Sequence, residues 1–325
     1  MIDHVLAVDI RSDAVSVSVV NKEGKWYFRR KKHYSERTGL QVLSCIGDQI
    51  AIVYEQAREA GIAIRYAGIS VPGIYNDVSG EIWAPNIPGW RKFPIREKLI
   101  DLFPPKTSIH IMADRCCCIL GETWQGNAKG IKNLVYLHIG AGIYAGLLVD
   151  GQILRGNDHI AGAAGWTALS PSFHPEYRTR GFLEYHASGN GLVKIAKDLI
   201  NNAPGYEGVL LSKGEQFNMQ DVFNAYKERD TIAISIINQA IQFWGMAIAN
   251  MISLLNPEKV IIGGSLFGPA TQFISRIREE MAKWSQPYCL KSVSLEPTTL
   301  GGSGSLIGAA RLAFIESMED ETLKR

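Results

Sequence analysis

Residues 134–149 have the sequence LVYLHIGAGIYAGLLV, in which two apolar runs flank a stretch of small residues. This pattern predicts a β-hairpin whose turn carries Gly140 and Gly142. Residues 5–20, VLAVDIRSDAVSVSVV, follow the same plan, because an apolar strand ends near Asp9 and an alternating strand follows it. Each half of the chain therefore begins with a hairpin, and this duplication predicts two α/β lobes.

Further elements alternate along the chain between these hairpins and after them. Short apolar runs predict strands at 26–31, 66–71, 109–114 and 260–262. Spacings of three and four predict helices at 39–60, 94–102, 114–125, 183–201, 218–229, 231–255, 270–284 and 304–316. Residues 84–90, APNIPGW, can only form a loop. The alternation is typical of mixed β-sheets with flanking helices.

Composition and charge exclude several classes of protein. The chain has 34 Lys and Arg against 32 Asp and Glu, so its near-neutral balance gives no footprint for nucleic acid or an anionic membrane. The basic cluster at 29–32 is expected to be the solvated end of a strand. We expect no membrane span, since no apolar run reaches about 18–20 residues and 231–255 carries several amides.

The chain start and the cysteines indicate a cytoplasmic location. Residues 1–5 lack a basic segment before the first strand, so no secretory signal is expected. Cys116, Cys117 and Cys118 are adjacent, and neighbours on a helix point about 100° apart, so they cannot share a metal. We expect them to be small, buried residues in a reducing compartment.

Several of these fixed points occur in an order that resembles the ROK family, named for repressors, open reading frames and sugar kinases. The resemblance covers nearly the whole chain, and it depends on the ordered set more than on any single motif. The set comprises Asp9, Pro72-Gly73, the loop around Asn86, Asp114 with Gly121-Glu122, the turn from Gly140 to Gly146, Ala161-Gly162 with Gly165, Gly181 to Glu184 with Ala187 to Gly189, and Gly263-Gly264.

The resemblance implies a two-lobed sugar kinase and actin-like fold, which is also described as ribonuclease H-like. Each lobe would hold a mixed β-sheet with flanking helices, and a sugar would bind in the cleft between them. The N-terminal lobe would span residues 1–117, joined by a C-terminal helix at 302–325. The C-terminal lobe would span residues 118–301.

The resemblance also implies roles for several of these residues. Asp114 would be the general base that takes the proton from the attacking sugar hydroxyl. Asn86 and Glu184 would hold other sugar hydroxyls. Asp9 would help to hold the metal ion and phosphates, together with Gly140 and Gly142 in the second glycine turn. Gly263 and Gly264 would face the adenosine of Mg-ATP.

Ordinary structural roles compete with these assignments. Asp114 stands at a strand-to-helix junction, where an Asp is a favourable N-cap, although its place in the ordered set favours catalysis. Glu184 lies in a first helical turn, where the helix dipole alone favours an acid. Asn86, between two prolines, and Asp9, at a strand end, could each serve a turn.

The phosphate side departs from the family pattern. Family kinases follow the first Asp with two glycines and a Thr, because bare amides must approach the phosphate oxygens. Here Asp9 is followed by Ile10, Arg11 and Ser12. In the second turn the Thr is replaced by Ala141 and a Gly by Tyr144. Both phosphate loops are therefore altered, although Arg11 and Ser12 could supply new contacts.

The sugar side departs from the pattern as well. The Glu and His of the family's Ala-Gly-Glu-x-Gly-His motif are replaced by Ala163 and Trp166. Trp166 could stack on a sugar, but we place it in the core first. His159 stands near the expected sugar rim. The family's structural zinc also needs three cysteines that are missing between Cys118 and Cys289, so we expect no metal here.

Taken together, the departures favour a sugar-binding, regulatory ROK protein whose ATP phosphotransfer is weak or lost. The alternative is an active ATP-dependent hexose or N-acetylhexosamine kinase with a rebuilt phosphate site. The repressor branch of the family carries a helix-turn-helix module ahead of the first strand. Only a few residues precede that strand here, so direct DNA binding is not expected. Family members commonly pair, which predicts a homodimer.

Overall fold

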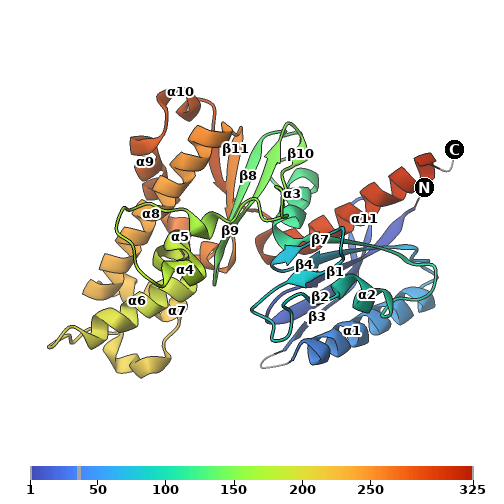
Figure 1. The fold of residues 1–325 in the computed structure, drawn as a ribbon, viewed down its shortest axis with the longest axis horizontal. Helices are drawn as coiled ribbons and strands as arrows, with labels where there is room; N and C mark the ends of the chain where they lie inside the picture. Colours follow the sequence, from blue (N-terminus) through green and yellow to red (C-terminus); the bar gives the residue numbers. More distant parts are fainter. Residues whose placement is uncertain (1, 35–37, 324–325) are drawn as a thin grey trace. The chain divides into compact units, whose positions relative to one another are not determined.

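The computed structural model of the protein describes residues 2–34 and 38–323, which form two compact units (Figure 1). Unit 1 comprises Met1–Gly130, Arg155–Ala161 and Ser303–Arg325, and unit 2 comprises Ile131–Leu154 and Gly162–Gly302. Unit 1 thus extends beyond 117, where the sequence predicted the lobe boundary. Residues 1, 35–37, 324 and 325 of the predicted lobes lie outside the described residues.

Unit 1 is built on a mixed sheet. Its strand order is β3-β2-β1-β4-β7, with the bounds β1 (His4–Ile10), β2 (Ala14–Asn21), β3 (Trp26–His33), β4 (Tyr66–Val71) and β7 (Ser108–Ala113). β1 pairs antiparallel with β2 and parallel with β4, and β4 pairs parallel with β7. A separate small hairpin joins β5 (Ile74–Tyr75) and β6 (Ile82–Trp83). The basic residues 29–32 are exposed on β3, as predicted.

Helices cover both faces of this sheet, and Figure 1 shows α1 and α11 on opposite sides of it. The helices of unit 1 are α1 (Gly39–Glu59), α2 (Ile95–Ile100), α3 (Asp114–Trp124) and α11 (Gly304–Leu323). Apolar side chains of α1 share one core cluster with Leu6, Val8 and Ile10 of β1. α11 lies against β1 and β4 on the other face and also packs on α3.

Close backbone contacts hold α11 in place. A Cβ atom on Gly308 of α11 would lie 1.7 Å from the carbonyl oxygen of Cys117 in α3, and one on Gly68 of β4 would lie 1.8 Å from that of Ala309. Both obstacles are backbone atoms, which no rotamer change can move away. Glycine is therefore required at these positions for α11 to approach α3 and β4.

We expect Gly308→Ala to lower the free energy of unfolding by about 1–3 kcal/mol, the usual cost of overpacking a well-packed core. The same change at Gly268, where nothing lies within 4 Å of the added Cβ and φ is −88°, controls for a Gly-to-Ala change without a steric clash. Urea unfolding followed by circular dichroism measures both. Equal stability of Gly308→Ala and the wild type would contradict the close packing.

Unit 2 repeats the architecture around a second mixed sheet of order β10-β9-β8-β11-β12. Its strands are β8 (Leu134–Ile139), β9 (Ile143–Val149), β10 (Gln152–Ile153), β11 (Lys259–Gly263) and β12 (Ser294–Pro297). Its helices are α4 (Tyr177–Arg180), α5 (Phe182–Ala187), α6 (Gly189–Asn201), α7 (Met219–Lys227), α8 (Thr231–Leu255), α9 (Ile274–Trp284) and α10 (Pro287–Leu290). Both predicted hairpins are present, which confirms the α/β class and the duplication.

The long helix α8 forms the centre of the unit 2 core. By length and composition it could cross a membrane, but 56% of its apolar window is buried inside the structure. Trp244 and Ile248 are fully buried there, among residues from several neighbouring helices. This agrees with the prediction of a core helix. The adjacent cysteines 116–118 of α3 are buried, as expected.

Three predicted helices differ from the sequence-based expectation. The helix predicted at 183–201 is interrupted at Ser188, whose extended backbone ends α5 and whose hydroxyl caps α6 by accepting from Gly191 N. The helix predicted at 270–284 starts as a 3₁₀ segment, and its α-helical part begins at Ile274. The last helix continues beyond the predicted end at 316 to Leu323.

Candidate functional site

Asp114 lies at the junction between β7 and α3 in unit 1. Ala113 ends the strand with an extended backbone, and Asp114 is the first residue of the helix. One carboxylate oxygen accepts a hydrogen bond from the amide of Arg115 at 2.7 Å. The side chain is half-buried, so its carboxylate is fixed and still reachable, as a general base must be.

Arg115, which sequence reasoning missed, organises the backbone around Asp114. It is 7% exposed, and its guanidinium donates to the carbonyl oxygens of Gly73 at 2.7 Å, of Ala161 at 3.2 Å and of His159. These contacts fasten the turn after β4 and the segment 155–161 beside the catalytic candidate. The signal in the sequence was an Arg that directly follows Asp114 and precedes three cysteines expected to be buried, because a charged residue in such surroundings needs partners.

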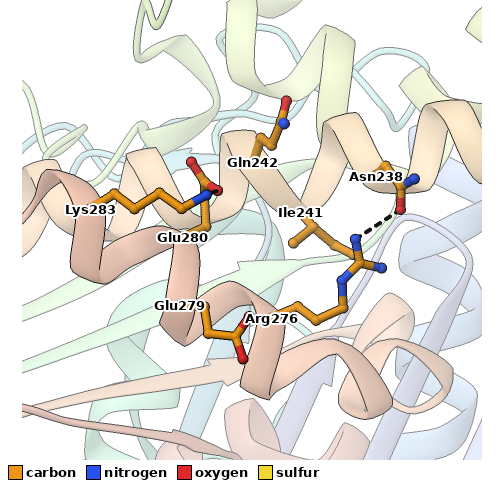
Figure 2. A pocket seen from close by; sticks show the side chains of 7 residues that line it. All are labelled: Asn238, Ile241, Gln242, Arg276, Glu279, Glu280 and Lys283. Atoms are coloured by element: carbon orange, nitrogen blue, oxygen red, sulfur yellow. Dashed lines mark hydrogen bonds and ion pairs between the residues drawn. The ribbon is translucent and has the colours of Figure 1, made fainter.

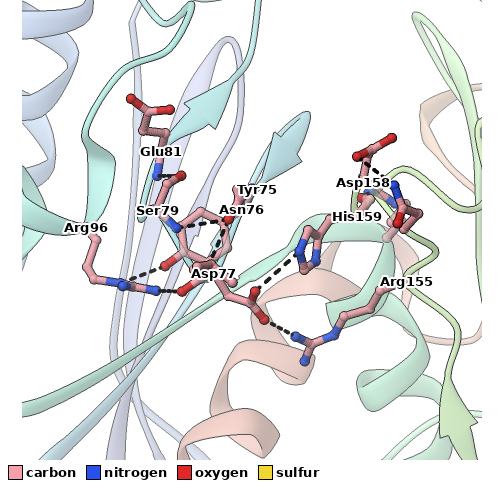
Figure 3. Close-up of polar contacts among 12 residues, drawn as sticks. Tyr75, Asn76, Asp77, Ser79, Glu81, Arg96, Arg155, Asp158 and His159 are labelled. Atoms are coloured by element: carbon pink, nitrogen blue, oxygen red, sulfur yellow. Dashed lines mark hydrogen bonds and ion pairs between the residues drawn. The ribbon is translucent and has the colours of Figure 1, made fainter.

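The segment 155–161 is also held by ion pairs to the loop after β5 (Figure 3). Asp77 accepts from Arg155 at 2.6 Å and faces His159 Nε2 at 3.4 Å. Arg96 donates to the carbonyl of Asp77 and, at 3.1 Å, to the hydroxyl of Tyr75. His159 has a left-handed backbone with φ of +57°, which is uncommon for a residue other than glycine. The contacts of segment 155–161 hold it in this conformation.

Beside this network lies a cavity of about 20 Å³, lined by Met112, Ala113, Cys116, Asp77 and His159 among others. It has room for a water molecule. His159, predicted at the sugar rim, thus faces the Asp77 carboxylate in unit 1.

Asn86 lies in the predicted loop and is exposed. The loop around it is anchored, because Trp90 is fully buried and its ring stacks on Phe93 at a centroid distance of 5.4 Å. The amide of Ala84 donates to the carbonyl of Trp90 at 2.7 Å, which closes the loop. The amide side chain of Asn86 therefore stands on a rigid support with its polar atoms available to a ligand.

The first turn brings Asp9, Arg11 and Ser12 together at the end of β1. Arg11 Nε lies 2.7 Å from one carboxylate oxygen of Asp9, and its terminal nitrogen lies 3.2 Å from the hydroxyl of Ser305. Ser12 is exposed at the tip of the turn. The guanidinium of Arg11 therefore points back to Asp9, which is 1% exposed.

One oxygen of this acidic group remains unsatisfied. Asp9 Oδ1 is buried and has no hydrogen-bond partner within the described chain, and the same holds for the hydroxyl of Ser70. Asp9 and Ser70 are register partners on neighbouring parallel strands, so both side chains emerge on the same face of the sheet. A carboxylate oxygen beside a hydroxyl suits a hard cation such as Mg²⁺.

In unit 2, the glycine turn between β8 and β9 carries Glu184 on one flank. Glu184 Oε2 accepts a hydrogen bond from the amide of Ile143 at 2.8 Å. A Cβ on Gly142 would lie 2.7 Å from this oxygen, and one on Gly165 would lie 3.2 Å from it. Burial raises the pKa of Glu184, while the Ile143 amide and Arg180 oppose that shift.

The other flank of the turn meets the end of β11. Gly264 has φ of +105°, and a Cβ there would lie 2.4 Å from the carbonyl oxygen of Ile139. A Cβ on Gly263 would lie 2.2 Å from the Tyr136 hydroxyl. The predicted nucleotide residues Gly140, Gly142, Gly263 and Gly264 therefore lie together after the neighbouring strands β8 and β11, and at Gly264 the positive φ and the Ile139 carbonyl require glycine.

Trp166 corrects a prediction. We expected it in the core, but it is 53% exposed and ends a short 3₁₀ segment, Ala164–Trp166. The turn packs through its backbone instead, since a Cβ on Gly181 would lie 2.6 Å from the Cα of Trp166. The indole is left open to solvent, which keeps the alternative of sugar stacking available.

The region of the family's zinc site contains an aromatic cluster. Tyr177 packs edge-on against Phe182 and Tyr185, and its hydroxyl lies 2.6 Å from His186 Nε2. Burial, together with the neighbouring His174, lowers the pKa of His186. Among residues 2–34 and 38–323 no three His, Cys, Asp or Glu side chains are grouped to bind a metal. His186 thus has a structural role in this cluster.

A larger depression lies between α8 and α9 of unit 2, away from all predicted site residues (Figure 2). Several of its polar groups are already hydrogen-bonded to neighbouring side chains. Arg276 donates to Asn238 at 2.9 Å, and Glu280 accepts from Lys283 at 2.6 Å and from Trp284 Nε1 at 2.9 Å. The hydrogen bond from Lys283 holds the pKa of Glu280 below its ordinary value. We assign no ligand to this depression.

Comparisons with known proteins agree with this arrangement. The profile described as "ROK family" matches residues 5–315. A glucokinase of Halalkalibacterium halodurans is 30% identical over 251 residues, which are 75% of this chain and 74% of that protein. A xylose repressor of Caldicellulosiruptor bescii is 24% identical over 98% of this chain and 79% of its own length.

A solved structure shows the same fold. The ROK glucokinase of Streptomyces griseus, in complex with glucose and AMPPNP, aligns with a TM-score of 0.79 and 24% identity over 96% of this chain and 99% of that one. This confirms the predicted two-lobed sugar kinase fold class. The chain belongs to the ROK family.

Proposed function

We propose that the protein is an ATP-dependent kinase of a hexose or an N-acetylhexosamine. The observation that carries this proposal is the half-buried carboxylate of Asp114, fixed at the start of α3 by the amide of Arg115. The 30% identity to a glucokinase supports the same class of reaction. Among the alternatives that the sequence left open, this function has the stronger support.

The chemistry follows from the position of that carboxylate. Asp114 accepts the proton of a sugar hydroxyl as the hydroxyl oxygen attacks the γ-phosphorus of ATP. The bond from that phosphorus to the β–γ bridging oxygen breaks, and ADP leaves with the electron pair. Arg115 acts through Asp114, because its three carbonyl contacts fix the backbone on both sides of the helix start.

Four side chains are candidates for sugar recognition in this proposal. Asn86 offers an amide on an anchored loop, and Glu184 offers a carboxylate that can accept hydrogen bonds from sugar hydroxyls. Exposed Trp166 offers an aromatic face. His159 is the weakest of the four candidates, since its ring already faces Asp77. The set thus offers polar contacts for sugar hydroxyls and one aromatic face for stacking on a sugar ring.

The nucleotide substrate in this proposal is Mg-ATP. Asp9 Oδ1 and the hydroxyl of Ser70 are oxygen atoms without a hydrogen-bond partner among the described residues and would be the ligands of a magnesium ion. When bound, that ion would neutralise charge on the phosphates. In unit 1, the exposed Ser12 would add a contact to phosphate, and Arg11 would do so only after leaving Asp9 and Ser305. In unit 2, Gly140, Gly142, Gly263 and Gly264 would give the nucleotide access to backbone amides.

A second candidate function is sugar-dependent regulation with phosphotransfer weak or lost. The Arg11–Asp9 ion pair favours it, because the guanidinium occupies a carboxylate oxygen that a kinase would offer to its metal. Similarity to a xylose repressor is compatible with it. In either case we propose a cytoplasmic homodimer, and analytical ultracentrifugation of the purified chain tests the oligomeric state.

Calorimetry and a coupled ADP-release assay separate the two functions. The purified chain is titrated with Mg-ATP, and with glucose, mannose, N-acetylglucosamine and N-acetylmannosamine. We expect one sugar to bind, to strengthen ATP binding and to support steady ADP release. Sugar binding without ATP binding or turnover would overturn the kinase proposal and leave the regulator.

A further inference from the structure

The β8–β9 hairpin carries an aromatic pair at the place where the family pattern has a glycine. His138 and Tyr144 are register partners across the hairpin. Their rings stack with centroids 4.3 Å apart and planes inclined by 3°. Both side chains are half-buried. The stack restrains the imidazole, because a flat ring contact at this separation is favourable and leaves little rotational freedom.

The pair lies on the face of the sheet opposite to the unit 2 core. Leu137, Ile139, Ile143 and Ala145 alternate with the pair and belong to the core cluster. Side chains alternate between the faces of a strand, so His138 and Tyr144 point away from that cluster. Core packing therefore does not explain why a large aromatic residue replaces glycine here.

The imidazole reaches the glycine turn. A Cβ on Gly140 would lie 2.8 Å from His138 Nε2 and 3.0 Å from the hydroxyl oxygen of Ser265. A ring nitrogen and a hydroxyl thus converge on the backbone of Gly140. Ser265 is brought there by the left-handed turn at Gly264, which packs on the carbonyl of Ile139.

The charges around the turn are arranged asymmetrically. The Glu184 carboxylate lies against Gly142, whereas the His138 imidazole and the Ser265 hydroxyl lie against Gly140. A phosphate is repelled by the carboxylate and is bound by ring N–H and O–H donors. An anion bound at this turn is therefore favoured on the Gly140 side.

We propose that His138 is a phosphate-binding residue of the nucleotide site and that Tyr144 positions its imidazole by stacking. Together with the Ser265 hydroxyl, this imidazole takes the place of the Thr hydroxyl that Ala141 lacks. The ligand class is a nucleoside di- or triphosphate. The inference rests on the proposed kinase function, and it explains how two departures from the family pattern, Ala141 and Tyr144, compensate each other.

The test uses the full chain and isothermal titration with Mg-ATP, Mg-ADP, adenosine and the sugar that binds best. We expect His138→Ala and Tyr144→Gly each to weaken Mg-ATP and Mg-ADP binding by about tenfold or more, as for loss of a hydrogen bond to a charged group. Adenosine and sugar affinity should stay within about twofold. Tyr144→Phe keeps the stacked ring and should restore nucleotide binding.

Tyr288→Gly on α10, where the side chain is 75% exposed, controls for a Tyr-to-Gly change away from the turn. Wild-type ATP affinity in His138→Ala would overturn the phosphate role while leaving the kinase function in place. An equal loss for adenosine would overturn it in favour of base stacking. Failure of the wild type to bind ATP or ADP would overturn the kinase function as well. If His138→Ala does not fold, Ser265→Ala carries the same comparison.

Discussion

Replacing Asp114 by Asn is expected to lower kcat by about 10²- to 10⁴-fold, the usual contribution of a general base. Asn keeps the size of the side chain and can still accept the hydrogen bond from the Arg115 amide, so the start of α3 should be preserved. What it loses is the ability to take a proton from the sugar hydroxyl. The change should therefore act on turnover and leave ground-state binding largely intact.

Steady-state kinetics with the sugar identified by calorimetry provides the measurement, alongside the sugar dissociation constant and the melting temperature of the variant. Asp48→Asn, on the exposed side of α1, serves as the matched control and should retain wild-type kcat. A variant at position 114 that turns over at more than about one tenth of the wild-type rate would refute the base assignment.

The elements that carry strong periodicity were predictable from sequence. Both hairpins and the long helix α8 appear at or within a few residues of their predicted ranges. Weak or composite signals were missed. β12 is a short edge strand that ends in Pro297, and β10 is shorter still, so neither contains enough alternation to be detected. The break at Ser188 depends on a single cap, which a periodic apolar pattern conceals.

The sequence predicted which types of residue form the candidate site, but it did not predict the contacts between them. The sequence placed Asp114 at a helix start and Gly140 and Gly142 in a turn, and the structure agrees. It could not reveal that Arg115 binds three carbonyls from two distant segments, because those contacts depend on tertiary structure. Likewise, the exposure of Trp166 follows from the backbone packing of Gly181, which hydrophobicity alone does not predict.

The altered phosphate loops change meaning once their contacts are known. Read as single substitutions, Arg11 and Tyr144 are losses of glycine that argue against phosphotransfer. In the structure each is paired, Arg11 with Asp9 and Tyr144 with His138. Asp9 also retains one unsatisfied oxygen. The Tyr144–His138 stack supports a rebuilt phosphate site. The Arg11–Asp9 ion pair occupies a carboxylate oxygen and supports the regulator, so the two substitutions point to different functions.

The second large effect is expected for Glu184→Gln, which should weaken sugar binding by about 10- to 100-fold, as for loss of a hydrogen bond to a charged acceptor. Gln can still accept from the Ile143 amide, so the turn should keep its shape. The same change should raise the melting temperature. Burial raises the pKa of Glu184, which means that the folded protein holds its charged form at a cost.

The sign of the pH dependence follows from that direction. The pKa of Glu184 is higher in the folded state, so the unfolded chain loses this proton first as the pH rises. The free energy of unfolding is therefore largest below the pKa of the unfolded chain, and it decreases as the pH rises through the folded-state pKa. The stability gain of Glu184→Gln should therefore be present at pH 7 and vanish at pH 3–4, near and below the ordinary pKa of about 4.3. Thermal melts at both pH values, together with sugar titrations at pH 7, test this.

Glu207→Gln, at an exposed site in unit 2, is the control and should change neither the melting temperature nor the sugar affinity. A variant at 184 that binds sugar like the wild type, with or without a stability gain, would show that Glu184 supports the turn and does not contact the substrate.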